Sequence, residues 1–165
     1  MNDAPQSIFD FFSKEEVLEA TLEADFDYIL KNKKKLVKYQ RGKFSFTDEK
    51  GVLQEFKIGI KPRGKYRRKV CGFPPLRVKF KKKGLQELGL NTQFNTLKLV
   101  SHCLEDEKNA KENILREYLI YKIYNLHSTY SLRAQLVKVT YVQKENHKKL
   151  FTRYAILLEN ENELA

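Results

Sequence analysis

The sequence predicts an α+β domain in which an antiparallel sheet of five to seven strands packs on one long helix. Several short segments alternate apolar and polar residues with a period of two, which is typical of half-buried strands. One long segment, residues 110–126, carries apolar residues at helical spacing. The last two apolar segments, 134–143 and 150–159, are joined by a short polar link, which predicts a closing hairpin.

The length and composition indicate one folded domain. The chain has 165 residues, of which 41% are hydrophobic and 32% charged, and such a mixture is typical of a folded chain. We expect residues 1–12 to form an N-terminal tail held by Phe9, Phe11 and Phe12. Residues 13–165 are then a single α+β domain.

The first part of this domain gives two alternative patterns. Ser13 and Glu16 have the spacing of a capping box, which predicts the start of a helix. Residues 17–23 alternate as in a strand, although the apolar residues of this region also fit a helical period. We favour the strand, followed by a helix that Asp25 caps and that continues to about Lys34.

A series of strands follows in the middle of the chain. Residues 43–46 and 53–60 read as two strands, joined by a turn in which Gly51 is free to adopt a positive φ. Two consecutive prolines, at 74–75, favour an extended backbone that leads into a strand over 76–80.

The long helix has a recognisable start. A helical turn at 85–88 and a strand at 96–102 come before it. Asn109 can cap the helix, with Glu112 at the third helical position. The predicted apolar stripe consists of Ile114, Leu115, Tyr118, Leu119, Ile123 and Leu126.

Positive charge is concentrated in one segment. The net charge is +11 and the isoelectric point is near 9.5. Between Phe56 and Gln86 there are twelve Lys and Arg residues and no Asp or Glu. A chain with this charge attracts polyanions such as nucleic acid, acidic lipid surfaces, acidic glycans and nucleotides.

Several classes of site and location find no support in the pattern. Cys71 and Cys103 are the only cysteines, and with three scattered histidines they do not make a structural zinc site. They are either buried small residues or one disulfide. No transmembrane run and no signal peptide are visible, and the localisation stays open.

Most enzyme motifs are also missing from the sequence, but one constellation remains. No glycine-rich phosphate loop, catalytic-loop signature or nucleophile elbow occurs. A strand, however, carries Lys79, and the later long helix carries Glu117. A strand lysine that contacts phosphates and is held by a helix carboxylate is the arrangement of a kinase small lobe. The same pattern also fits an ordinary lysine on the solvated face of a sheet.

The order of several segments adds a family resemblance. IGIKPRGKYRRK, PPLRVKF, FNTLKLVSHC, NILREYLIYKIYN and the hairpin that ends in ILLENENELA follow one another. In this order they resemble the small-lobe half of the CotH-type spore-coat kinase family, in the divergent form found in predicted exported bacterial proteins. The resemblance covers roughly residues 17–163.

The resemblance implies a kinase-like small lobe that binds ATP with Mg²⁺ through Lys79. Arg63 and Gly64 would lie in the loop over the phosphates. Glu117 or Arg116 would support Lys79 from the helix, and the helix arginine of the family matches Arg116.

Glu159 would lie near the adenine, where the family has its hinge. The metal-binding and catalytic carboxylates of the family lie beyond the segments that match. The resemblance therefore implies the N-terminal lobe of a longer protein, inactive alone, with the missing C-terminal lobe or a second copy as its partner.

Two alternatives to a nucleotide-binding lobe remain. Residues 61–83 can form a polyanion-binding surface, with Tyr66 and Phe73 interleaved among the basic residues. In either interpretation we expect Arg67, Arg68, Lys69 and 81–83 to form a solvated or polyanion-facing edge. The other alternative is a surface-associated domain that binds no small ligand.

Overall fold

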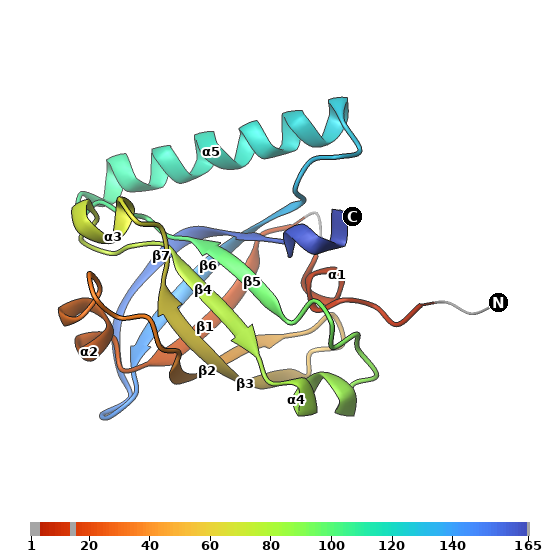
Figure 1. Ribbon diagram of the computed structural model, residues 1–165, viewed down its shortest axis with the longest axis horizontal. Helices are drawn as coiled ribbons and strands as arrows, with labels where there is room; N and C mark the ends of the chain where they lie inside the picture. Colours follow the sequence, from red (N-terminus) through yellow and green to blue (C-terminus); the bar gives the residue numbers. More distant parts are fainter. Residues whose placement is uncertain (1–3, 14–15, 165) are drawn as a thin grey trace.

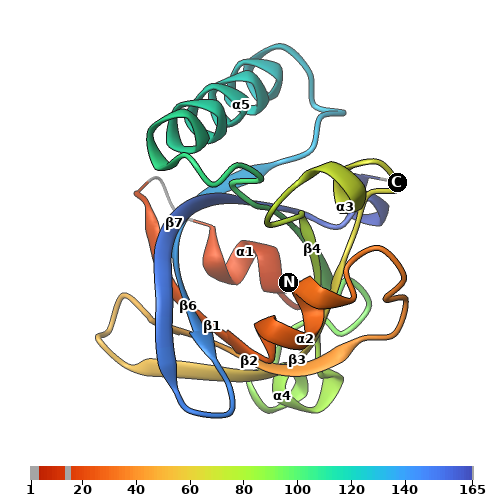
Figure 2. The ribbon, with the colours of Figure 1, turned by 90° about the vertical axis from the view of Figure 1, so that its left-hand side faces the viewer.

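Seven strands form a closed barrel in the order β1-β2-β3-β4-β5-β7-β6. The structure is a computed structural model and describes residues 4–13 and 16–164. The strands are β1 (Leu18–Ala24), β2 (Gln40–Thr47), β3 (Leu53–Pro62), β4 (Leu76–Phe80), β5 (Thr96–Val100), β6 (Ala134–Gln143) and β7 (Lys148–Leu158). Figure 2 looks into one end of this barrel.

Short helices and one long helix complete the chain. They are α1 (Ile8–Phe12), α2 (Phe26–Lys31), α3 (Arg67–Val70), α4 (Lys82–Glu87) and α5 (Glu107–His127), with a 3₁₀ turn at Glu161–Leu164. Helix α5 lies across the outside of the barrel (Figure 1) and packs on β6 and β7. None of the helices in the described ranges is long and apolar enough to span a membrane.

The predicted open antiparallel sheet, and with it the kinase-like small lobe, is wrong. Strand β1 pairs with β2 in the antiparallel direction and with β6 in the parallel direction, so that Leu18 lies opposite Val137. This parallel pair joins the two edges that an open sheet would leave exposed. Closure satisfies the backbone groups of both edge strands. The alternation within β1 predicted which side chains are buried but not which strand lies beside it.

Most predicted elements are present with shifted ends. Residues 76–80 form a strand as predicted, and Asp25 caps α2 by accepting a hydrogen bond from the Tyr28 amide at 3.0 Å. The long helix begins earlier than predicted, because Asp106 and not Asn109 is its N-cap. The predicted capping box of residues 13–16 includes residues 14–15, which lie outside the described residues.

Helix α1 fills one end of the barrel. Ile8, Phe9 and Phe12 are buried, and Figure 2 shows α1 inside the outline of the strands. Within the predicted tail, residues 8–12 thus contribute to the core. The Phe12 ring contacts four aromatic rings of the barrel interior, those of Phe44, Phe46, Phe56 and Phe80.

The apolar stripe of the long helix is only half buried. Ala110 and Ile114 are buried, and Ile114 belongs to a small core with β6 and β7. Leu119, Ile123 and Leu126, which the periodicity predicts to face the sheet, are exposed. The helix is longer than the part of the barrel that it covers, so its C-terminal half presents this apolar surface outward.

Candidate functional site

The outer side of β3, β4 and β5 carries a row of positive charges. Alternation places Leu76, Val78 and Phe80 in the barrel interior, so that Arg77 and its neighbours point outward. The strand register then sets Lys61 opposite Arg77 and Arg77 opposite Lys98. We call Lys61, Arg77, Lys79 and Lys98 the basic face.

Little negative charge compensates this row. Lys98 pairs with Glu161 at 2.5 Å, and no described residue forms an ion pair with Lys61, Arg77 or Lys79. Like charges directly opposite one another on neighbouring strands destabilise a sheet. The arrangement is therefore costly for folding alone and suits the binding of an anion.

An aromatic ring lies on the same face. The Nζ atoms of Lys61 and Lys79 lie 4.5 Å and 5.7 Å from the centre of the Tyr39 ring, within the range of cation–π attraction. Gly59 makes room for this ring, because a Cβ at position 59 would come within 3.0 Å of the Tyr39 side chain. A surface pocket of about 210 Å³ beside the ring is also lined by Arg77 and Lys98.

A second group of cations lies where β3 ends. The Arg63 side chain is half-buried, and its buried Nε atom has no hydrogen-bond partner among residues 4–13 and 16–164. Burial lowers the pKa of Arg63, and the neighbouring charges of Arg77 and Arg67 lower it further. We call Arg63, Arg67 and Arg77 the arginine cluster; Arg77 belongs to both groups.

Helix α5 contributes a phenol to this cluster. Burial raises the pKa of Tyr121, as does the charge of Glu117, while Arg63 and Arg67 act in the opposite direction. The charges of both arginines thus act on the Tyr121 phenol, which is neutral and can donate a hydrogen bond. Gly64 begins the connection from Arg63 to Arg67 with a φ of 82°, a conformation that favours glycine.

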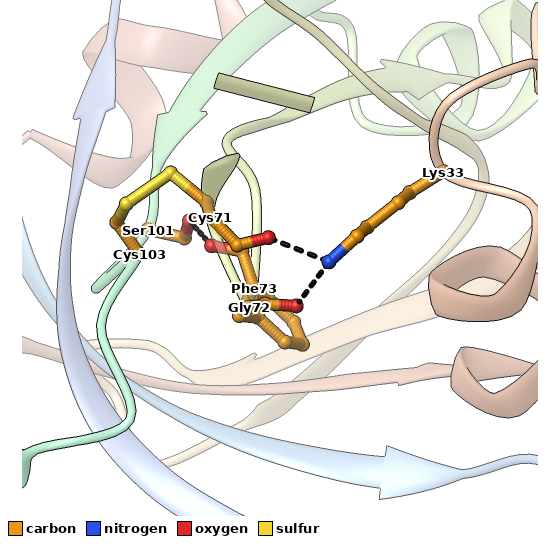
Figure 3. Close-up of a disulfide and its surroundings, with 6 residues drawn as sticks. All are labelled: Lys33, Cys71, Gly72, Phe73, Ser101 and Cys103. Carbon is orange, nitrogen blue, oxygen red and sulfur yellow. Dashed lines mark hydrogen bonds between the residues drawn. A yellow bond between two sulfur atoms is a disulfide. The ribbon is translucent and has the colours of Figure 1, made fainter. Parts of the chain in front are cut away.

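A disulfide anchors the segment that carries these arginines. Cys71, which directly follows α3, forms a disulfide with Cys103 (Figure 3). The Lys33 Nζ donates hydrogen bonds to the carbonyl oxygens of Cys71 and Gly72. Ser101 Oγ donates to the carbonyl of Phe73 at 2.8 Å. The sequence left open whether the cysteines are free or bonded, and the structure resolves this as one disulfide.

Some cations of the basic segment hold the fold together, whereas others are free to bind a ligand. The Arg68 guanidinium donates to the backbone carbonyls of Lys33 and Leu36, at 2.6 Å and 3.0 Å. Arg68 therefore holds the connection after α2 and is not part of a solvated edge. Arg67, one residue earlier, is exposed.

The site residues that the kinase resemblance implies lie in several places. Arg63 and Gly64 are adjacent, and Glu117 lies near them through Tyr121. Lys79 lies on the basic face, and the described residues show no ion pair between it and Glu117. Arg116 is exposed.

The other two predicted residues make ion pairs elsewhere. Arg116 pairs with Glu112 at 3.4 Å on the surface of α5. Glu159 is buried, accepts from Arg133 Nε at 2.8 Å and from the Arg133 amide at 2.6 Å, and belongs to a network in which Arg133 also binds Asp10 at 2.6 Å. This network ties the end of β7 to α1.

The sequence patterns did not indicate Tyr39, Lys98 or Tyr121, and they included Lys61 only as part of the basic segment 61–83. The polar positions of strands 53–60, 76–80 and 96–102 do show basic residues, which was a usable signal for an outward-facing row. Their alignment across three strands depends on the register, which no local pattern specifies. Tyr121 reaches the cluster only because α5 crosses the barrel.

The ligand of this site is indicated neither by a metal centre nor by similarity to a known protein. Over residues 4–13 and 16–164, no group of three or more His, Cys, Asp or Glu side chains is placed to hold a metal ion. No family model, no curated protein and no solved structure matches the chain.

Proposed function

We propose that this domain binds a polyanion on its basic face. The observation that carries the proposal is the alignment of Lys61, Arg77 and Lys98 on three neighbouring strands. Among the described residues, an acid compensates this row only at Lys98, through Glu161. A polyanion supplies the missing negative charge, and its binding releases condensed counterions. Tyr39 adds a partly buried aromatic surface beside the cations, as in proteins that bind single strands by stacking and charge.

Fluorescence anisotropy with a labelled single-stranded DNA oligonucleotide over a range of salt concentrations tests this proposal. We expect affinity to fall steeply with salt for the parent chain. The triple variant Lys61→Gln, Arg77→Gln, Lys98→Gln should lower the slope of log K against log salt by roughly two, if each cation neutralises one phosphate.

A control variant with the same loss of charge is available in the β6–β7 hairpin. Lys144→Gln, Lys148→Gln, Lys149→Gln changes three exposed lysines and should leave the slope close to that of the parent. Equal weakening by both triple variants would show that only net charge matters. No binding by the parent, to this oligonucleotide or to heparin, would contradict the proposal.

Mg-ATP is a second candidate ligand of the same face. The kinase-like fold is not observed, so this candidate rests on the family resemblance and on the position of Lys79 beside an aromatic ring. In this proposal the chain supplies the nucleotide-binding part of an atypical kinase and is inactive alone.

Calorimetric titration of Mg-ATP into the parent and into Lys79→Met tests the second candidate. We expect the variant to lose binding, because the ammonium that meets the phosphates is removed, while Lys138→Met on β6 retains it. Equal binding by the parent and Lys79→Met would exclude Lys79 from the nucleotide site.

Association through the exposed half of α5, with a following lobe or a second copy, stays a prediction that sedimentation can test.

A further inference from the structure

The arginine cluster differs from the basic face in its degree of burial. On the basic face, exposed Lys79 can be hydrated. Arg63 instead has a buried Nε atom for which the described part of the chain offers no hydrogen-bond partner. Buried polar atoms in folded proteins are nearly always paired, and a buried N–H of a charged group that lacks a partner is more costly than that of a neutral group. Such an atom calls for a ligand or a functional explanation.

The surroundings of Arg63 increase this cost. Its nearest charged neighbours include Arg77 and Arg67, which are cations. Glu161 is the acid whose charge acts on Arg63, but its carboxylate is already bonded to Lys98. The strand register places Arg77 beside the end of β3, which Arg63 follows, and the Arg67 side chain lies against Gly64. The three arginines are therefore neighbours with little compensating charge.

The geometry provides donors suited to a tetrahedral anion. A guanidinium presents its N–H groups as a planar fork that matches two oxygens of a phosphate. Arg63, Arg67 and Arg77 approach from the end of β3, from α3 and from β4, and Tyr121 adds a neutral hydroxyl from α5. A doubly charged ligand offsets most of the cluster's charge, which a single carboxylate cannot do.

We propose that the arginine cluster is a binding site for a terminal phosphate group, a phosphate monoester, held between Arg63, Arg67 and Arg77 with Tyr121 as an additional donor. This inference rests on the proposed function, because it specifies which group of the anionic ligand is recognised. The basic face contacts the remainder of the ligand, and the cluster binds its end.

Thermal unfolding with inorganic phosphate as the probe tests the site directly. Phosphate should raise the Tm of the parent by about 3–6 °C at roughly ten times Kd, measured against chloride at equal ionic strength. Arg63→Met should have a higher Tm than the parent without phosphate, because the buried N–H without a partner and the repulsion from the neighbouring arginines are gone. The same variant should lose the response to phosphate.

Two further variants keep the test decisive if Arg63→Met fails to fold. Arg67→Gln changes an exposed residue and should reduce the phosphate response by at least half. Arg116→Gln removes an exposed arginine of α5 and should respond like the parent. An equal response in all variants, or none in the parent, overturns the site.

A lipid headgroup and the end of a nucleic acid can both supply a phosphate monoester. Two binding experiments distinguish these two sources. One compares oligonucleotides with a 5′-phosphate and a 5′-hydroxyl; the other compares vesicles containing phosphatidic acid and phosphatidylserine. A preference for the monoester that Arg63→Met abolishes, in either arm, supports the site and identifies its source. Absence of such a preference in both arms overturns the monoester assignment.

Failure of this inference can be distinguished from failure of the proposed function. Lys61→Gln with Lys79→Gln weakens the basic face and leaves the arginine cluster intact, because the Lys98–Glu161 ion pair is kept. If this variant and the parent respond equally to phosphate while neither binds oligonucleotide or heparin, the cluster stands and the polyanion proposal fails. If oligonucleotide binding is strong but insensitive to Arg63 and to a terminal phosphate, the cluster assignment fails alone.

Discussion

His102 shows how strongly burial changes a single titratable residue in this barrel. Its ring stacks on Phe73, with ring centres 4.8 Å apart, and meets the edge of Phe151 at 5.2 Å. Only 8% of the residue is exposed, and no described residue forms a hydrogen bond with its Nδ1. Burial, with a smaller contribution from the charge of Arg153, lowers the pKa of His102 from 6.5 to about 4.

The low pKa of His102 makes stability depend on pH. In the unfolded chain His102 takes up a proton below its ordinary pKa of 6.5, whereas in the folded chain it stays neutral until about pH 4. Stability is therefore complete above pH 6.5 and falls as the pH decreases toward 4. From this residue alone we expect a loss of about 3 kcal/mol in the free energy of unfolding.

Urea unfolding at several pH values between 7 and 4 measures this effect, with His102→Phe as the comparison. The variant lacks the titrating group, so its stability should fall less than that of the parent, and carboxylates account for the remaining slope. Parallel curves for the two chains would contradict the assignment.

At the scale of elements, α3 is placed by contacts outside itself. The helix has four residues, and its N-cap makes no side-chain hydrogen bond. Helices this short are unstable alone. The disulfide and the Lys33 hydrogen bonds (Figure 3) anchor the residues after it, and the Arg68 contacts hold the helix itself beside the connection after α2. Arg67 thereby joins the arginine cluster.

Removal of the disulfide should affect both stability and the site. The bond joins cysteines separated by 32 residues, and loop-closure entropy predicts a loss of about 3–4 kcal/mol for Cys71→Ala with Cys103→Ala. Urea unfolding of this variant, beside the parent with and without reductant, measures the loss.

The response of the same double variant to phosphate reports on the position of α3. We expect it to shrink, because Arg67 is no longer held beside Arg63. A variant as stable as the parent would mean that the other contacts of the segment are sufficient.

At the scale of the whole molecule, closure of the barrel around α1 unites distant parts of the chain. Phe12 comes from the first residues, yet its ring lies against rings from β2, β3 and β4. The Asp10–Arg133–Glu159 network joins the same helix to the last strand. The N-terminal segment is thus part of the core that makes the barrel a closed unit.

Phe12→Ala tests whether α1 is essential to this core. A fully buried phenylalanine leaves a cavity when truncated, and we expect a loss of about 3–5 kcal/mol in the free energy of unfolding. Phe11, which is half-buried, provides the matched control, and Phe11→Ala should cost clearly less. Equal and small losses of unfolding free energy in the two variants would show that the barrel is stable without the packing of α1 in its interior.

Local patterns in the sequence determined the strands and helices themselves. Alternation predicted strand 76–80 and the closing hairpin, Asp25 predicted the start of α2, and the helical stripe predicted α5. The run of basic residues predicted a positive surface around 61–83. Each of these depends on residues close together in the chain, where side-chain period and capping chemistry act directly.

Only the tertiary structure decided how the elements are joined and which charges meet. Contacts between distant segments decide the parallel pairing of β1 with β6, the insertion of α1 and the half-burial of α5. Among the possible arrangements, the one that buries the most apolar surface and leaves the fewest backbone groups without hydrogen bonds is the most stable. The same holds for the register that aligns Lys61, Arg77 and Lys98, and for the proximity of Tyr121 to Arg63. A one-residue change of register would leave the local pattern intact and move every one of these side chains to the other face.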